Sequence, residues 1–122
     1  MDAIFGEWVT PDNGLVRIGP CGEAPCGLLV DFPPPPGFTR ETTRDANNRD
    51  REKRGRKLLG IPVLWNLSGN GDDGWRGRAY DPRRGLSASV SATLDPPGRL
   101  RLRGCVRVVV DMCRTEVWRR AR

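Results

Sequence analysis

The clearest pattern in the chain is an alternation of apolar and polar residues over residues 86–94. Leucine, alanine and valine occupy one side of this segment, and three serines and a threonine occupy the other. A period of two residues is typical of a β-strand with one buried face and one solvated face. Elsewhere, short apolar runs are separated by turn-forming residues, with no convincing helical periodicity. The predicted strands are 4–10, 14–18, 26–32, 61–67, 75–80, 86–94, 99–108 and 114–119.

The order of these strands predicts an all-β fold made of one domain over residues 1–122. Most connections are hairpin-like and none resembles a helical crossover, so we expect a small antiparallel up-and-down eight-stranded barrel. A barrel of eight strands is the smallest whose interior is either filled by side chains or encloses one small ligand. The strand pattern is compatible with both arrangements.

Residues 33–57, which we call the excursion, depart from the strand pattern. Pro33 to Pro36 form a stiff polyproline stretch, and residues 39–57 contain almost no apolar side chain. A segment with charge but no hydrophobic face forms either a polar loop or a short polar helix. We expect the excursion to leave the barrel at one end, with the prolines bridging that end.

The four cysteines are Cys21, Cys26, Cys105 and Cys113. Zinc ligands usually come in pairs about two residues apart, whereas these pairs are separated by four and seven residues, and the chain has no histidine. We therefore expect two disulfides instead of a zinc site. Cys105 and Cys113 lie symmetrically about Val109, so a hairpin centred there would pair them, which leaves Cys21 for Cys26.

The cysteines also bear on the cellular location, because disulfides persist in oxidising compartments. The chain starts Met1-Asp2-Ala3 and soon reaches its first predicted strand, which fits a cytosolic protein or an exported protein whose signal peptide has been removed. The cysteines favour the second interpretation, so we expect a periplasmic or secreted protein. No run approaches the roughly 18 apolar residues of a membrane helix, so we do not expect a transmembrane protein.

Positive charge is concentrated in the excursion. The chain carries 21 basic and 15 acidic residues, a net charge of +6, and residues 40–57 hold eight of the basic and four of the acidic ones. Because acidic residues interleave with the basic ones, a solvated loop is favoured over a nucleic-acid site. If the segment binds a protein or an anionic surface, the candidate contacts are Arg49, Arg54, Arg56 and Lys57.

The sequence offers little for catalysis or metal binding. The chain has no histidine, the commonest general base, and the serines of residues 86–94 have no evident partner base. Residues 70–74 contain two aspartates without the ligand spacing of a calcium loop, so a hairpin turn is favoured there. We therefore expect no enzyme activity, no metal and no cofactor.

Three aromatic residues are the candidates for a binding pocket, namely Trp65, Trp75 and Tyr80. They fall on consecutive predicted strands, where they either line an apolar pocket or fill the core. The first hypothesis is a barrel that binds a small apolar or amphipathic molecule entering near the excursion. The alternative is a filled barrel that acts as a protein–protein or envelope-surface module through residues 49–57.

A series of short motifs extends over nearly the whole chain in a specific order. It comprises Gly6-Glu7-Trp8, Cys21-Gly22, Cys26 to Val30, Asn48, Asp50, Arg54, Arg56, Leu58, Gly60, Ile61 to Leu64, Trp75-Arg76-Gly77, Tyr80-Asp81-Pro82, Gly85, Leu102 to Cys105, Cys113-Arg114, Trp118 and Arg120. In these motifs the sequence resembles domain-of-unknown-function family 2147, a family of bacterial proteins. The resemblance implies a lipocalin-like barrel, export to the periplasm and no established activity.

The sequence departs from that family near Ala88, where an aromatic residue is usual. If the aromatic residue serves a ligand site, this protein binds a different ligand or none. The first and last predicted strands also resemble lipocalins, in which a tryptophan closes the bottom of the barrel and a basic side chain covers its ring. This resemblance implies that Arg120 or Arg119, next to Trp118, covers Trp8 in a structural role. We expect the protein to be a monomer.

Overall fold

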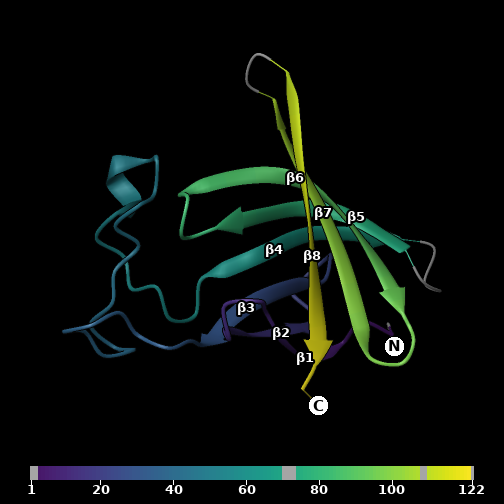
Figure 1. Ribbon diagram of the computed structural model, residues 1–122, viewed down its shortest axis with the longest axis horizontal. Coiled ribbons are helices and arrows are strands. Elements are labelled where there is room, and N and C mark those ends of the chain that lie inside the picture. The colour runs from purple at the N-terminus through teal and green to yellow at the C-terminus, as the bar shows by residue number, and fades with distance from the viewer. Residues whose placement is uncertain (1–2, 70–73, 108–109, 122) are drawn as a thin grey trace.

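Eight antiparallel strands form one closed barrel in the computed structural model, which describes residues 3–69, 74–107 and 110–121. Each strand pairs with the next along the chain, and the last strand pairs with the first (Figure 1). The strands are β1 (Gly6–Val9), β2 (Leu15–Gly19), β3 (Cys26–Asp31), β4 (Pro62–Gly69), β5 (Gly74–Asp81), β6 (Leu86–Asp95), β7 (Arg99–Arg107) and β8 (Asp111–Arg120). The predicted all-β up-and-down barrel is confirmed, and every predicted strand overlaps an observed one.

The strand β6 shows how the sequence pattern becomes a barrel wall. Val90 and Ala92 are buried, whereas Ser87, Ser89 and Ser91 face outward and are exposed. β6 pairs with β5 on one side and with β7 on the other. A shift of one residue in either pairing would turn the apolar side chains to water, so the alternation also sets the register.

Both chain termini lie at one end of the barrel (Figure 1). Large apolar side chains of the core fill this end. Trp8, Trp75 and Leu100 are at most 3% exposed there. Trp75 lies directly over Gly69 of β4, because a Cβ added to Gly69 would come within 2.6 Å of the indole Cδ1. Only glycine at position 69 allows the indole ring to approach the backbone this closely.

Arg120 covers the filled end. Its guanidinium carbon lies 4.2 Å from the centroid of the Trp8 ring. Its terminal nitrogens donate hydrogen bonds to the backbone oxygens of Phe5, at 3.0 Å, and Ala3, at 2.7 Å. Of the two arginines considered from the sequence, Arg120 rather than Arg119 therefore lies over the tryptophan and ties the N-terminal segment to β8.

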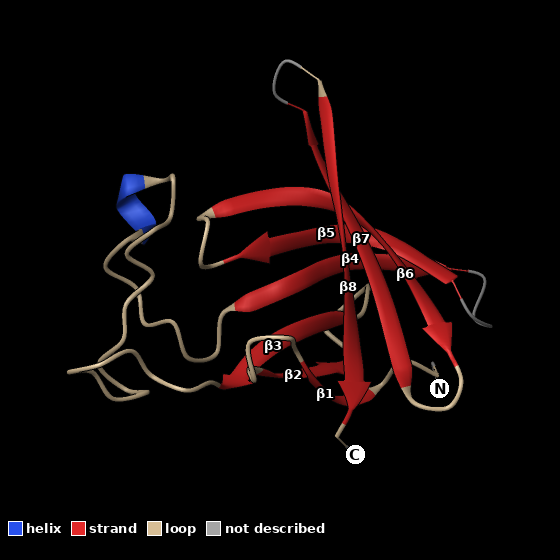
Figure 2. Ribbon diagram, viewed as in Figure 1, coloured by secondary structure: helices blue, strands red, loops and turns tan. Residues whose placement is uncertain are grey.

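The excursion connects β3 to β4 and consists of turns, extended segments and one short 3-10 helix, η1 (Arg51–Lys53) (Figure 2). Asp50 caps η1, because its side chain accepts a hydrogen bond from the backbone N–H of Glu52. The sequence suggested either a polar loop or a short helix, and the structure contains both. No helix in the described part of the chain is long and apolar enough to cross a membrane.

Two disulfides join Cys21 to Cys26 and Cys105 to Cys113, as the sequence predicted. All four cysteines are therefore bonded in pairs and do not form a zinc site. The second disulfide joins β7 to β8 at cross-strand partner positions. The hairpin centre suggested at Val109 and most of the turn suggested at residues 70–74 lie outside the described residues.

Candidate ligand-binding cavity

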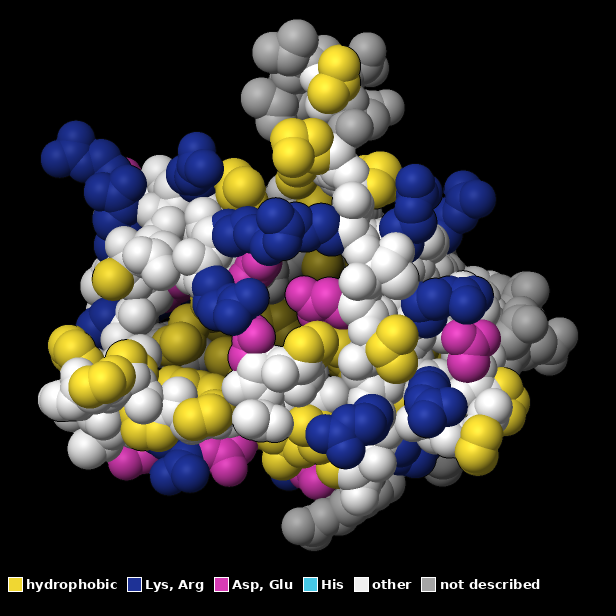
Figure 3. Space-filling model, viewed as in Figure 1, with side chains coloured by type: hydrophobic (Ala, Val, Ile, Leu, Met, Phe, Trp, Pro, Cys, Tyr) yellow, Lys and Arg dark blue, Asp and Glu magenta, His cyan; other side chains and the backbone are white. Residues whose placement is uncertain are grey.

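The end of the barrel opposite to the chain termini is hollow. A cavity of about 750 Å³ opens there beside the excursion, and Figure 3 shows its apolar floor behind charged side chains. The inner wall is apolar and includes the side chains of Val16, Leu29, Leu64, Ala79, Ala88, Val90, Leu102, Val106 and Trp118. The barrel is therefore filled at one end and open at the other.

The cavity exists because small residues face inward on three neighbouring strands. Ala79 of β5 and Ala88 of β6 are cross-strand partners, and both line the cavity. Gly104 of β7 lines the same space, and a Cβ added to it would approach no atom closer than 3.8 Å. Near the filled end, β5 and β7 carry Trp75 and Leu100 instead. The change from large to small side chains along the strands hollows out one half of the barrel.

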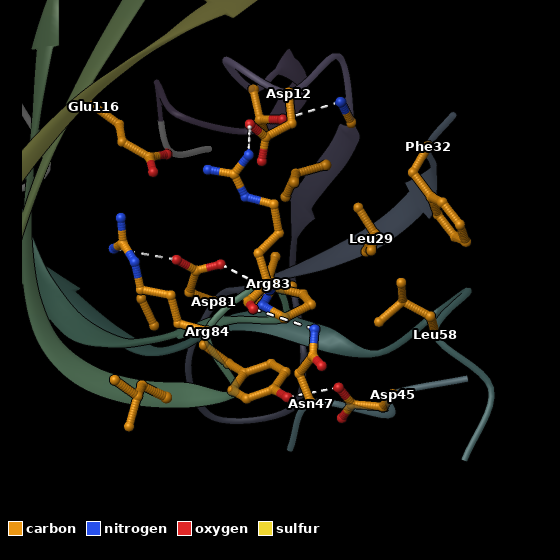
Figure 4. A pocket seen from close by; sticks show the side chains of 18 of the residues that line it. Asp12, Leu29, Phe32, Asp45, Asn47, Leu58, Asp81, Arg83, Arg84 and Glu116 are labelled. Atoms are coloured by element: carbon orange, nitrogen blue, oxygen red, sulfur yellow. Dashed lines mark hydrogen bonds and ion pairs between the residues drawn. The ribbon is translucent and has the colours of Figure 1, made fainter. Parts of the chain in front are cut away.

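Charged side chains surround the mouth of the cavity (Figure 4). Arg83 of the β5–β6 turn forms a 2.9 Å ion pair with Asp12 of the β1–β2 turn, and Arg84 forms a 3.4 Å ion pair with Asp81. Glu116 of β8 reaches the same mouth (Figure 4). Ion pairs open to solvent contribute at most about 1 kcal/mol each, so both partners remain able to interact with a polar group of a ligand.

The excursion and its flanking residues supply the remaining wall of the cavity. Phe32, Pro33, Pro35, Phe38 and Leu58 line it on this side. Phe38 is 54% exposed, so the apolar surface continues from the cavity to its outer edge. The proline stretch borders the open end of the barrel, where the sequence suggested a bridge.

A buried carboxylate holds the excursion against β5. The Asp45 side chain is fully buried, and its Oδ1 accepts a 2.5 Å hydrogen bond from the Tyr80 hydroxyl. Its Oδ2 accepts from Asn48 Nδ2 at 2.8 Å and from Arg56 Nε at 2.9 Å. Burial, followed by the adjacent Asp45 carboxylate, raises the pKa of the Tyr80 hydroxyl well above its usual value of about 10. The hydroxyl therefore stays protonated and keeps its role as donor.

The β5–β6 turn provides a second attachment for the excursion. Gly85 has a φ of +68°, and it packs so closely on Asn47 that an added Cβ would overlap the carbonyl oxygen of that residue. The Gly85 carbonyl accepts a 3.2 Å hydrogen bond from the backbone N–H of Arg49. The Arg83 carbonyl accepts a 3.2 Å bond from Asn47 Nδ2. The turn and the excursion thus form one connected rim.

The three aromatic residues that the sequence offered as pocket candidates do not lie together in the structure. Tyr80 lines the cavity, whereas the described lining includes neither Trp65 nor Trp75. Trp75 lies in the filled half, and Trp65 is half-buried against the core. The sequence interpretation missed the small residues that create the space. Its one pointer to them was Ala88, where the chain departs from the family pattern.

The basic residues of the excursion also fall into two groups. Arg54 Nε donates a 2.7 Å hydrogen bond to the backbone oxygen of Asn48, and Arg56 pairs with the buried carboxylate described above. These two arginines therefore hold the excursion in its conformation. Arg49 and Lys57 have exposed side chains.

An antiparallel barrel of eight strands with an apolar cavity open at one end is the architecture of a lipocalin-like protein. The chain belongs to the family of uncharacterised proteins conserved in bacteria called DUF2147, whose profile matches residues 6–120. A solved structure with the same fold is that of HP1028 from Helicobacter pylori, which is described as belonging to the lipocalin family. The two structures have a TM-score of 0.81 and 18% sequence identity, over 100% of this chain and 85% of that one. No curated protein matches the sequence.

Proposed function

We propose that this protein binds one small amphipathic molecule in the hollow end of the barrel, and that it acts as a binding protein rather than an enzyme. The observation that carries the proposal is the cavity itself. Its volume of about 750 Å³ lies within the range of roughly 300–1,000 Å³ that small-molecule sites occupy. An apolar wall with a few polar groups at one side is also typical of such sites.

The distribution of apolar and charged side chains sets the orientation of the ligand. Its apolar part lies along the inner wall, beside Ala88 and Leu102. Its polar part lies at the mouth, within reach of Arg83, Arg84 and Glu116. The ligand enters beside the excursion, where Phe38 is exposed. A purely apolar ligand would make no polar contact with the charged groups of the mouth, so we favour an amphipathic one.

The carboxylates of the cavity support binding rather than catalysis. Asp12 and Asp81 pair with arginines, and Asp45 accepts hydrogen bonds from three side chains. A general base has to be directed at the proton that it abstracts, whereas the contacts of these three carboxylates run along the rim of the cavity and hold it in place.

We place the protein in the periplasm or outside the cell. Two disulfides suit an oxidising compartment, and the bacterial lipocalin-like family fits an extracytoplasmic location. The alternative function, a protein–protein or envelope-surface module that acts through residues 49–57, is less favoured. Arg54 and Arg56, two of its four candidate contacts, bind within the excursion itself.

The proposal is tested by filling the cavity. The fluorescent amphiphile 1-anilinonaphthalene-8-sulfonate serves as the probe, and fatty acids and lysophospholipids serve as competitors. Ala88→Trp places an indole in the cavity, and Ser91→Trp is the matched control because Ser91 lies on the outer face of β6. We expect Ala88→Trp to weaken probe binding at least about tenfold, whereas Ser91→Trp leaves it unchanged. Equal binding by both variants would place the probe outside the cavity and contradict the proposal.

A further inference from the structure

The strand β8 has an open edge. On one side, β8 pairs with β7 along nearly its whole length. Arg119 lies opposite Arg99 at one end of this pairing, and Asp111 lies opposite Arg107 at the other. On the other side it pairs with β1 only through its last residues, because β1 ends at Val9, which lies opposite Arg119. Among the described strands, residues 112–118 therefore have no partner on this side (Figure 1).

The side chains along this edge are also uncovered. All six residues from 112 to 117 are exposed, although neighbouring residues of a strand point to opposite faces. They include the apolar side chains of Met112, at 55% exposure, and Val117, at 45%. An exposed strand edge presents unpaired backbone groups to which another strand can add.

Two hydrogen bonds show which backbone groups face the open edge. The N–H of Arg120 donates at 2.8 Å to Gly98, on the β7 side, and the N–H of Ala121 donates at 2.8 Å to Glu7, on the β1 side. Backbone groups of successive residues alternate in direction along an antiparallel strand, and β8 pairs with β7 without a register shift. The N–H and C=O groups of Cys113, Thr115 and Val117 therefore point to the open edge.

We propose that this edge binds the same edge of a second copy of the chain, antiparallel and about a two-fold axis at Thr115. In this register Thr115 meets its own copy, and Cys113 faces Val117 of the partner subunit. All of these residues direct their backbone groups outward, so they form the hydrogen-bonded pairs of the new ladder. The pairing is self-complementary, because Cys113 of each copy faces Val117 of the other copy, as a two-fold interface requires.

Charge complementarity selects this register. With Thr115 at the axis, Arg114 lies directly opposite Glu116 of the partner subunit, and the symmetry produces this pair twice. Opposite charges at facing positions stabilise a pair of strands, whereas like charges destabilise it. A two-fold axis at Cys113 would place Arg114 opposite Met112, and an axis at Val117 would place it opposite Arg120. Neither of these registers pairs opposite charges.

The expectation of a monomer came from the sequence, which does not reveal that β1 ends at Val9 and pairs only with the last residues of β8. The inference of a dimer is independent of the proposed ligand. Arg114 and Glu116 also line the mouth of the cavity, so the pairing would bring the mouths of the two barrels side by side.

Sedimentation velocity of the full chain, from micromolar to nearly millimolar concentration, tests the proposal. We expect a reversible dimer for the wild-type protein. Thr115→Pro removes an N–H that points to the open edge while sparing the bonds to β7, so it should give a monomer. Thr115→Val keeps that N–H and should remain dimeric. Thermal unfolding of each variant checks that the barrel is intact.

Charge exchange tests the register even if the proline variant does not fold. Arg114→Glu and Glu116→Arg each place like charges opposite one another and should raise the dissociation constant of the dimer about tenfold. The double variant exchanges the charges and should return to within about threefold of the wild-type value. A monomeric wild-type protein, a dimeric Thr115→Pro variant or a double variant as weak as the single ones would each overturn the proposal.

Discussion

The Tyr80 hydroxyl donates a 2.5 Å hydrogen bond to Oδ1 of Asp45, across a sequence separation of 35 residues. This bond joins β5 of the barrel to the excursion, which forms one wall of the cavity. Since the Asp45 side chain is fully buried, its charge is balanced by the donors around it and not by water. The position of the cavity wall thus depends on this carboxylate.

Removal of the Tyr80 hydroxyl should loosen the excursion. Tyr80→Phe leaves Asp45 Oδ1 without its donor, so we expect the free energy of unfolding to fall by about 2 kcal/mol. Asp45→Asn should cost more, because the amide replaces a carboxylate oxygen that accepts from Arg56. Urea denaturation measures the loss, and limited trypsin digestion shows whether the basic residues of the excursion become accessible. Glu41→Gln, at an exposed position of the same segment, should match the wild type in both assays.

The ionisation of Tyr80 should be delayed in the folded protein. The pKa of its hydroxyl is raised by burial and by Asp45, whereas the unfolded chain ionises at its usual pKa of about 10. The stability that this difference contributes is fully present below about pH 10 and is lost as the pH rises from there through the folded-state pKa. Because Tyr80 is the only tyrosine, its phenolate absorbance can be followed directly. Ionisation at the usual pKa in the folded protein would show that the hydroxyl is not buried against Asp45.

Gly85 should tolerate no side chain. Gly85→Ala forces an alanine into the left-handed region, where φ is +68°, and drives its Cβ into the Asn47 carbonyl. We expect a loss of more than about 2 kcal/mol in the free energy of unfolding. Gly19→Ala is the matched control, since an added Cβ there meets no atom within 4 Å. Equal stability of the two variants would mean that the excursion does not rest on the β5–β6 turn.

Arg120 should stabilise the filled end of the barrel. Arg120→Met removes a cation–π contact with Trp8 and two hydrogen bonds to the N-terminal segment, so we expect a loss of about 1–3 kcal/mol. Arg119→Met changes an exposed neighbour and should alter stability by less than about 0.5 kcal/mol. Thermal unfolding of both variants provides the comparison. A larger loss for Arg119→Met would show that Arg120 does not have the covering role.

The barrel was predictable from the sequence because its determinants are local. The alternation in residues 86–94 defines a strand and its two faces without reference to the rest of the chain. The Cys105–Cys113 disulfide was predictable for a similar reason, because the two residues lie symmetrically within one hairpin. Each of these features depends on residues that are close in sequence.

The cavity was not predictable in the same way, because it is a property of residues on different strands. Ala79, Ala88 and Gly104 are unremarkable strand residues one at a time, and they create a hollow only where β5, β6 and β7 bring them together. The attachment of Asp45 to Tyr80 likewise joins two segments that show no common pattern. Trp75 was a reasonable pocket candidate by residue type, and its place near the filled end depends on the strand register.

Native mass spectrometry of the protein recovered from the periplasm of an expressing bacterium tests the central claim most directly. We expect one small molecule bound per barrel, released on denaturation, with a mass that shows both disulfides formed. The Ala88→Trp variant, purified in the same way, should carry no adduct, whereas Ser91→Trp should carry it. An adduct retained equally by Ala88→Trp, or wild-type protein that stays empty after exposure to fatty acids and lysophospholipids, would contradict a ligand site in the hollow end of the barrel.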